Sequence, residues 1–324
     1  MVRTAVLPTE LPPLEGRAIV HRSDRVAVGV AGVLWTLVIV VLLAFFAVFL
    51  VYAFSLMAFP FDYDQGEGYD VNSGLLLSRF ESPYLDNSVY PFYSSNYTPV
   101  FSMLLVPLIW LFGPGLWVGR FVSLVASVVS GLLIWLIVRR ETRDTLAATV
   151  ATLAFFASNY VYHVSALGRV NTTALALGLA GIYCISRVRR GGVIAGLGLL
   201  LAAVFTKPTM AAVVAVAFVY LLVRDRRRGL SLPQSLLKGQ GARAIAAFGA
   251  AGVALSVLWQ VLSGGWFYRN TIEGNINDFY WMQTLSFFVN FSASHVILLA
   301  GMVAALMLAV EARVRWGRSR TTPA

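Results

Sequence analysis

Charged residues are scarce in this chain. Only 12% of its 324 residues are Asp, Glu, Lys or Arg, whereas 58% are hydrophobic, and the mean hydropathy is +0.75. A soluble domain carries about 25% charged residues, so the composition excludes an ordinary soluble protein. Several apolar runs reach the length of about 18 residues that predicts a transmembrane helix. We therefore expect an all-α, polytopic bundle of transmembrane helices.

Cysteine and histidine are also rare. The chain has one cysteine, Cys184, inside an apolar run, and three histidines that lie far apart. A single cysteine cannot close an intramolecular disulfide, and this set gives no zinc-binding pattern. The sequence therefore predicts no metal centre and no cofactor, and leaves room only for a divalent cation held loosely by carboxylates.

Basic residues outnumber acidic ones, 25 to 15, and the formal net charge is +10. They occur in short clusters between apolar runs, which is typical of cytoplasmic loops of membrane proteins and argues against a nucleic-acid partner. We expect three regions: a cytoplasmic tail over residues 1–28, a transmembrane domain over 29–311, and a basic cytoplasmic tail over 312–324.

The first helix, residues 29–54, is expected to run outward and to lead into a long outer loop, 55–98. The later predicted helices are 99–112, 116–138, 145–164, 174–186, 193–206, 209–223, 244–262 and a last span ending near Val310. Residues 99–112 would form a helix of about 21 Å, short of the hydrocarbon core of about 30 Å, so we expect them not to cross. Of the 25 basic residues, 20 then lie on the cytoplasmic side. The other five are Arg79, Arg120, Arg169, Lys207 and Arg269.

The outer loop contains the stretch FDYDQGEGYD, residues 61–70, in which four carboxylates fall within nine positions. Gly66 and Gly68 are expected to let the backbone turn tightly there. Charged groups at membrane depth are costly and tend to mark functional sites. Isolated cations such as Arg169 and Lys207 suit a lipid phosphate, and a nearby carboxylate suits removal of a proton from a hydroxyl. This combination favours transfer of a group from a lipid-linked donor.

Two features allow a plainer interpretation. A lone cation at a helix end is often a snorkelling side chain, which fits Arg79 or Arg269 equally well. Tyr90, Tyr93 and Tyr97 fit either an interfacial aromatic belt or stacking on sugar rings.

Further motifs follow the DQGEG of residues 64–68. NYTPVFSMLLVPLIWLFGPGLWVGRFVSLVAS begins at Asn96, GRVNTTALALGLAGIY at Gly168 and LAAVFTKPTM at Leu201. In this order they resemble the Tyr-Pro-Pro helix, Phe-Gly turn, Arg-led helix, Arg-x-Asp segment and Thr-Lys hairpin of the GT-C superfamily of membrane glycosyltransferases. The resemblance is to the protein O-mannosyltransferase and aminoarabinose-transferase branch, of the glycosyltransferase family 39 type.

This resemblance implies a transferase that uses a polyprenyl-phosphate sugar on the non-cytoplasmic side of the plasma (inner) membrane. An aspartate of the first outer loop would act as general base on the acceptor hydroxyl, in an inverting displacement. By position, Asp64 is the expected base, and Glu67 would orient the acceptor or the base. The expected contacts to substrate and lipid phosphate are Arg120, Arg169, Lys207, Tyr97 and Asn171. The implied partners are the donor, a hydroxyl acceptor on a glycan, lipid or protein, and membrane lipids.

The chain departs from the family pattern in three places. Asn171 stands where many relatives have aspartate after the Arg-x pattern, and it cannot supply charge there. Thr98 replaces the first proline of Tyr-Pro-Pro. Relatives usually continue after about eight crossings with more helices or a further domain, so a fragment, a short variant or one half of a complex is expected.

Two other functions remain open from the sequence. A transporter or flippase component would place ionisable groups near the bilayer midplane of several helices, whereas most helix interiors here lack them. The charges gather at one face, which favours the enzyme. The other alternative is a catalytically inactive scaffold descended from such an enzyme.

Overall fold

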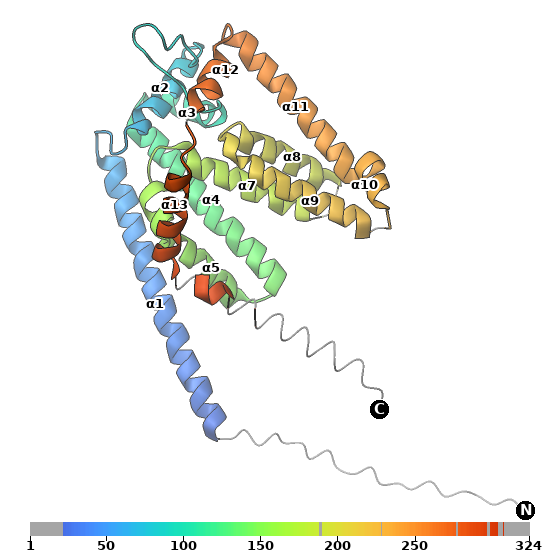
Figure 1. Ribbon diagram of the computed structural model, residues 1–324. Helices are drawn as coiled ribbons and strands as arrows, with labels where there is room; N and C mark the ends of the chain where they lie inside the picture. Colours follow the sequence, from blue (N-terminus) through green and yellow to red (C-terminus); the bar gives the residue numbers. More distant parts are fainter. Residues whose placement is uncertain are drawn as a thin grey trace, which may run out of the picture. The chain divides into compact units, whose positions relative to one another are not determined.

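The computed structural model describes residues 22–187, 190–227, 229–276, 278–296, 299–303 and 307, and every regular element among them is helical (Figure 1). The predicted all-α class is confirmed. The chain divides into two units, residues 1–274 and 275–324, which we describe separately. The helices of the first unit are α1 (Arg22–Ala58), α2 (Gly66–Ser78), α3 (Val100–Phe112), α4 (Leu116–Thr142), α5 (Thr145–Ala157), α6 (Asn159–Val164), α7 (Val170–Ser186), α8 (Arg190–Val204), the 3-10 turn η1 (Pro208–Met210), α9 (Ala211–Arg227), α10 (Leu232–Lys238), α11 (Gln240–Leu262) and α12 (Trp266–Thr271). The 3-10 turn η2 (Glu273–Asn275) crosses the boundary, and the second unit contains α13 (Trp281–Ser294).

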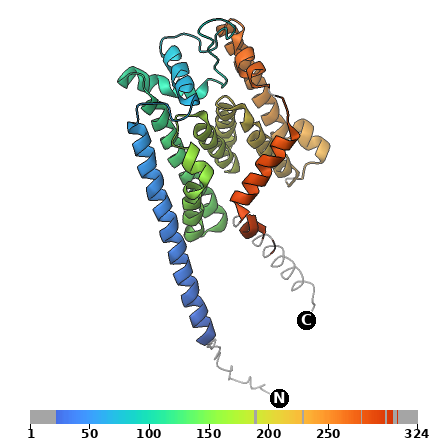
Figure 2. The same cartoon turned by 60° about the vertical axis from the view of Figure 1, so that its left-hand side comes forward.

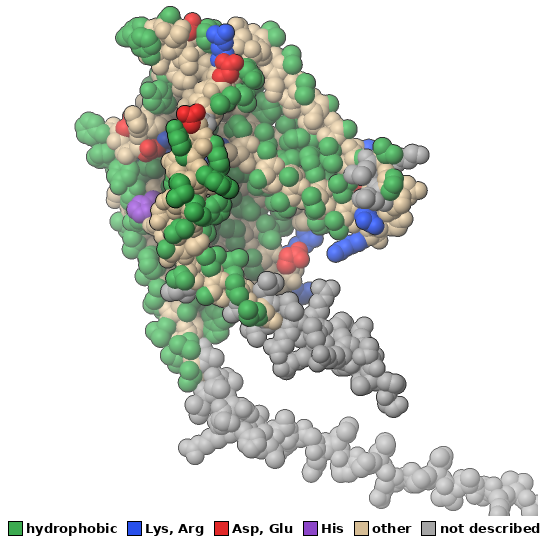
Figure 3. All heavy atoms as spheres, in the orientation of Figure 1, with side chains coloured by type: hydrophobic (Ala, Val, Ile, Leu, Met, Phe, Trp, Pro, Cys, Tyr) green, Lys and Arg blue, Asp and Glu red, His purple; other side chains and the backbone are tan. Residues whose placement is uncertain are grey.

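Four helical stretches in the described part are long and apolar enough to cross a membrane. They are Gly32–Ala58, Leu116–Thr142, Pro208–Arg227 and Pro233–Leu262. Their outward surfaces are apolar: Leu37 is 56% exposed on α1, and Val261 is 72% exposed on α11. Figure 3 shows hydrophobic side chains along α1 and over the helices of the first unit, with charged side chains confined to a few places. Such surfaces match the lipid environment that the composition predicts.

The short helix α3 has 13 residues, or about 20 Å. It is too short to cross a hydrocarbon core of about 30 Å on its own, as expected from its sequence. Pro99 precedes it, and Gly113, with φ of +82°, ends it. The helix packs against α2 and α4, so it belongs to the part of the fold that surrounds the acidic stretch.

The basic cluster RRETRD separates two antiparallel helices. Arg143 adopts left-handed backbone angles and ends α4, whereas the Asp144 carboxylate caps α5 by accepting from the backbone N–H of Leu146 (2.8 Å) and Ala147 (3.2 Å). A capping aspartate satisfies N–H groups that a helix start leaves unpaired. Local chemistry therefore sets this turn.

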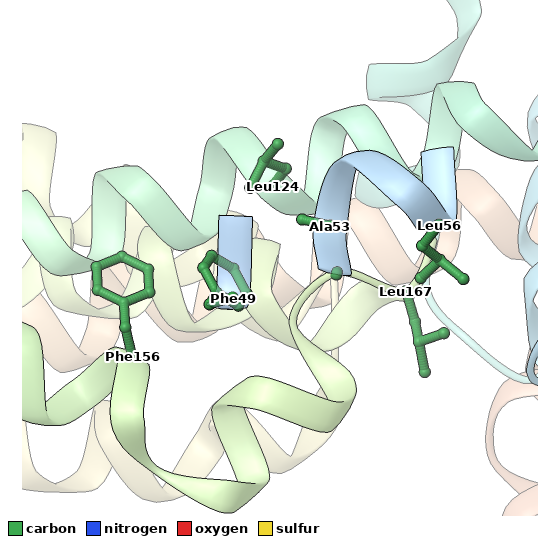
Figure 4. Close-up of a cluster of buried hydrophobic side chains, with 7 residues drawn as sticks. Phe49, Ala53, Leu56, Leu124, Phe156 and Leu167 are labelled. Atoms are coloured by element: carbon green, nitrogen blue, oxygen red, sulfur yellow. The ribbon is translucent and has the colours of Figure 1, made fainter. Parts of the chain in front are cut away.

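Four buried apolar clusters hold the first unit together, the smallest of which consists of Tyr84, Phe205 and Phe267. Figure 4 shows the cluster that joins α1, α4 and α5, including Phe49, Leu124 and Phe156. A second joins α2, α3, α4 and α7, and a third joins α7, α8, α9 and α11. Figures 1 and 2 both show α1 running beside α4 and α5, with α2 and α3 near the end of α1 and the beginning of α4. The second cluster therefore packs against α2, the helix that contains Glu67 and Asp70 of the acidic stretch.

Some predicted boundaries differ from those observed. The outer loop 55–98 contains a helix, α2, because Val71, Leu75 and their neighbours bury an apolar face against α3 and α4. The predicted helix 145–164 is interrupted at Ser158, whose extended backbone separates α5 from α6. Residues 1–21 of the predicted N-terminal tail, much of the last predicted span and the tail 312–324 lie outside the described residues.

Candidate active site

Three of the cations predicted for the outer side lie where helices begin. Arg120 lies near the start of α4, Arg169 is the N-cap of α7, and Lys207 directly precedes η1, which leads into α9. A helix start carries partial positive charge, which adds to the charge of each side chain. The acids of the first outer loop contact two of these cations.

Arg120 and Glu67 form a fully buried ion pair. The guanidinium donates Nε–H to Glu67 Oε1 (2.8 Å) and Nη2–H to Glu67 Oε2 (2.7 Å). Its other N–H groups donate to the backbone carbonyls of Leu56, Phe59 and Phe61. All five guanidinium N–H groups therefore have a partner, and none is left for a ligand.

Both oxygens of the Glu67 carboxylate likewise accept hydrogen bonds within the protein. The carboxylate also accepts from the backbone N–H of Tyr63 (3.0 Å) and of Gly168 (2.8 Å). Burial alone would raise its pKa, but the hydrogen bonds from Arg120 and from these two backbone groups hold the pKa below its usual value. The pair thus ties the end of α1, the start of α2 and the turn before α7 to α4. This geometry favours a structural role for both residues over the phosphate contact expected for Arg120 and over orientation of the acceptor or the base by Glu67.

Arg169 lies between two aspartates. Its Nη1 forms an ion pair with Asp64 Oδ2, and its Nε lies 3.2 Å from Asp70 Oδ2. The second contact is close but not aligned for hydrogen bonding, and neither of its two atoms has another hydrogen-bond partner. Asp64 is the more accessible acid, with 42% of its side chain exposed against 9% for Asp70.

Asp70 was not among the site residues predicted from the sequence. Burial raises its pKa from 3.8 to about 7; the Arg169 guanidinium opposes this shift, and the carboxylates of Asp64 and Glu67 add to it. A carboxyl group that titrates near neutrality in a cleft is a candidate functional group. The only sequence signal was its place as the fourth acid of the stretch 61–70; its burial depends on how α2 packs.

Gly66 and Gly68 have a different role from the tight turn expected for them. Both lie in α2, and neither has a positive φ. A Cβ atom on Gly66 would overlap the Arg169 guanidinium, and one on Gly68 would lie 2.8 Å from Asp62 Oδ2. Gly66 is therefore needed because Arg169 packs directly on its backbone.

A polar cavity of about 300 Å³ opens beside Arg169. Asp70 and Arg169 contribute its charged walls, and the aromatic residues around it are Tyr69, Phe92 and Tyr97. The Arg169 guanidinium lies 5.8 Å from the centre of the Tyr97 ring, and its Nη2 lies 3.4 Å from the Tyr97 hydroxyl. The predicted residues Tyr97, Arg169 and Asp64 are thus brought together, with Asp64 as the outer partner of Arg169.

Two further residues predicted from the sequence, Asn171 and Lys207, line an apolar cavity of about 410 Å³. The Lys207 ammonium donates to Asn171 Oδ1 at 2.6 Å. Two more of its lining residues, Ser165 and Thr172, have buried hydroxyl groups without a hydrogen-bond partner. Burial, and then the nearby Arg169, lower the pKa of Lys207. This cavity therefore combines apolar walls with one cation and two unpaired hydroxyl groups.

Residues from distant parts of the sequence fix the loop over residues 92–97, which forms part of the wall of the polar cavity. Asn270 of α12 is fully buried; its Oδ1 accepts from the Ser95 backbone (3.1 Å), and its Nδ2 donates to the Leu85 carbonyl (3.0 Å). Thr98, which replaces a proline of the family pattern, donates to the Val204 carbonyl (3.1 Å). Sequence reasoning missed both roles because neither pairing has a local signal.

The described residues hold no group of three or more His, Cys, Asp and Glu side chains that could bind a metal ion. Asp64 and Asp70 share Arg169 instead. The loosely bound divalent cation considered from the sequence therefore remains an untested prediction.

Comparison with known protein families gives a match. The family described as dolichyl-phosphate-mannose-protein mannosyltransferase matches residues 96–250, a little under half of the 324-residue chain. The matched part includes Arg120, Arg169 and Lys207, whereas the acids of α2 precede it. Neither curated proteins nor solved structures give a match. Together with the helical fold, the family match supports the resemblance of this chain to the GT-C superfamily of integral membrane glycosyltransferases that use a lipid-linked sugar, and it leaves the branch unassigned.

Proposed function

We propose that the chain transfers a sugar from a polyprenyl-phosphate donor to an acceptor hydroxyl on the non-cytoplasmic side of the plasma membrane. One observation carries this proposal: Arg169, which pairs with Asp64 and Asp70, is the N-cap of α7, and Asn171 in the first turn of that helix accepts a hydrogen bond from Lys207 at the apolar cavity. A transfer from a lipid phosphate needs both groups, a carboxylate for the acceptor proton and cations for the leaving phosphate.

The donor fits the apolar cavity. Its first isoprene units would lie against Val164, Leu175 and Met210, which line the walls, and its phosphate would lie at the Lys207 end. The first backbone N–H groups of α7 add partial positive charge at this point. The unpartnered hydroxyl groups of Ser165 and Thr172 could donate to phosphate oxygens. Lys207 would exchange its contact with Asn171 for the phosphate.

The reaction is a single displacement. The acceptor hydroxyl gives its proton to the Asp64 carboxylate, and its oxygen forms a bond to the anomeric carbon of the sugar. The bond between that carbon and the phosphate oxygen breaks, and the electron pair leaves with the polyprenyl phosphate, whose charge Lys207 and Arg169 stabilise. A single displacement inverts the anomeric configuration. Movement of Arg169 towards the phosphate would also free Asp64 to accept the proton.

The distribution of charge supports the proposed side of the membrane. Arg139 and Arg140 lie in the last turn of α4, at the opposite end from Arg120, and further arginines lie in the last turn of α9, at the opposite end from Lys207. Arginine-rich helix ends are typical of the cytoplasmic side. This supports a non-cytoplasmic site.

The proposal is tested with the purified full chain in liposomes. Radiolabelled polyprenyl-phosphate mannose and polyprenyl-phosphate arabinose are supplied separately, each with a neutral oligosaccharide, a Ser/Thr peptide and a hydroxyl-bearing glycolipid. We expect one donor to be consumed and its label to appear on an acceptor. Movement of intact donor between leaflets would contradict the proposal and favour a flippase. Intact donor in every reaction would also contradict it.

A further inference from the structure

The polar cavity beside Arg169 has the chemistry of a carbohydrate site. We infer that the acceptor is a neutral saccharide, one of whose rings is held in this cavity of about 300 Å³ with a hydroxyl directed towards the aspartates. This inference rests on the proposed function and adds the acceptor class to it. Three properties of the cavity carry it: its exposed aromatic faces, its balanced charge and its fixed polar wall.

Two of the three aromatic residues of the cavity are exposed rather than packed in a core, whereas Tyr97 is half-buried against the second apolar cluster. Tyr69 is 50% exposed and Phe92 is 65% exposed, and both line the cavity. Tyr69 is held in place because its ring stacks on Tyr93, with centroids 5.7 Å apart and an interplanar angle of 27°. The apolar C–H face of a sugar ring stacks on such rings, and removal of exposed apolar surface from water stabilises the contact.

The charges of the cavity wall balance. Among the described lining residues, Asp70 and Arg169 are the ones with carboxylate or guanidinium groups, and they lie 3.2 Å apart. A ligand with net charge would meet one of them as a like charge, whereas a neutral ligand with many hydroxyl groups meets both as hydrogen-bond partners. This favours a neutral saccharide over a phosphorylated or acidic acceptor.

A further polar part of the cavity wall is preorganised. The Ser73 hydroxyl lies 2.6 Å from the Tyr93 hydroxyl and 3.1 Å from the Ser95 hydroxyl, and Asn270 fixes the Ser95 backbone. Groups held in this way lose little freedom on binding a ligand. Fixed hydroxyl groups suit the many hydroxyl groups of a sugar.

The other acceptor classes fit less well. A peptide binds through a length of extended backbone, whereas this cavity lies at the lower end of the range of about 300–1,000 Å³ for small-molecule sites, which suits a compact ring. A lipid acceptor needs apolar walls, whereas polar and charged side chains such as Asp70, Ser95 and Arg169 make up much of the wall of this cavity. In the reaction, the saccharide hydroxyl loses its proton to the carboxylate as the new glycosidic C–O bond forms and the C–O bond to phosphate breaks.

The test measures binding and transfer separately. Binding of neutral manno- and gluco-oligosaccharides to the full chain in detergent is measured by saturation-transfer NMR and calorimetry without donor. We expect binding that Tyr69→Ala weakens about tenfold and that Tyr69→Phe retains, because phenylalanine keeps the ring. Phe80→Ala is the matched control, since Phe80 is an aromatic residue just after the end of α2 that is 89% exposed and does not line the cavity.

Transfer is then followed in liposomes with the donor that is consumed. Label on the oligosaccharide, with a higher acceptor KM in Tyr69→Ala and an unchanged donor KM, is the expected result. Label on the peptide or glycolipid instead, or saccharide binding that does not respond to Tyr69→Ala, overturns the inference. Saccharide binding without consumption of any donor supports the carbohydrate cavity and contradicts the proposed function, so the two failures are distinguishable.

Discussion

Replacement of Asp64 by asparagine is expected to lower kcat for sugar transfer by about 100- to 10,000-fold, the range that a general base contributes. Asparagine has nearly the same shape and still accepts a hydrogen bond from Arg169, but it cannot take a proton from the acceptor. Asp64 lies on the accessible side of Arg169, with 42% of its side chain exposed, and is not part of the buried core. The variant should therefore fold, and its donor KM should stay close to that of the wild type. Both constants are measured in the liposome assay.

The variants Gly66→Ala and Gly68→Ala test the arrangement of Asp64 and Arg169 without altering a charge. Gly66→Ala places a methyl group where the Arg169 guanidinium lies, so the guanidinium is displaced from the position between Asp64 and Asp70 from which it would stabilise the leaving phosphate. Gly68→Ala is the matched control, because it makes the same change in the same helix and displaces only the Asp62 carboxylate. We expect Gly66→Ala to lose activity and Gly68→Ala to retain it.

Wild-type kcat in Asp64→Asn would contradict the assignment of Asp64 as the general base and would shift this role to Asp70.

Arg120→Ala is expected to destabilise the fold itself. Removal of one partner of a buried ion pair costs about 3–5 kcal/mol, because the Glu67 carboxylate would remain buried without its counter-ion, and three backbone carbonyls would lose their donor. The loss should appear as a lower midpoint of thermal unfolding in detergent, or as loss of the monodisperse species in size-exclusion chromatography. Glu67→Gln should shift stability in the same direction.

Arg79→Ala is the control for this prediction. Arg79 is an exposed arginine at the C-cap of α2, and truncation of an exposed arginine changes stability by only about 0.5 kcal/mol. If Arg120→Ala unfolded at the wild-type temperature and only donor binding were weakened, Arg120 would contact the phosphate as the resemblance implies, and the structural role would be contradicted.

The helical class could be predicted from the sequence because composition and long apolar runs determine it directly. The sequence also predicted acids and cations at one face, and the structure brings Asp64 to Arg169 and places Lys207 at a neighbouring cavity. Such convergence can be inferred because ionised groups in an apolar chain need partners or water.

The pairing of those charges could not be predicted. Whether Arg120 contacts Glu67 or a lipid depends on the angle at which α2 crosses α4, which the second apolar cluster sets. The burial of Asp70 and the hydrogen bonds of Asn270 to Ser95 and Leu85 likewise depend on packing between segments that are far apart in the sequence. A sequence motif gives residue types and order, whereas these roles depend on which atoms lie within hydrogen-bond distance.

The most direct test of the account measures donor binding by the variants Lys207→Ala and Arg79→Ala. Both residues are cations predicted for the outer side, but of the two only Lys207 lines the apolar cavity. The account predicts that Lys207→Ala raises the donor Kd about tenfold or more, since a charge-assisted contact contributes about 1.5–3 kcal/mol, and that Arg79→Ala leaves it unchanged. Equal donor affinity in Lys207→Ala and the wild type would contradict a single site that joins the acids of the first loop to the cations downstream.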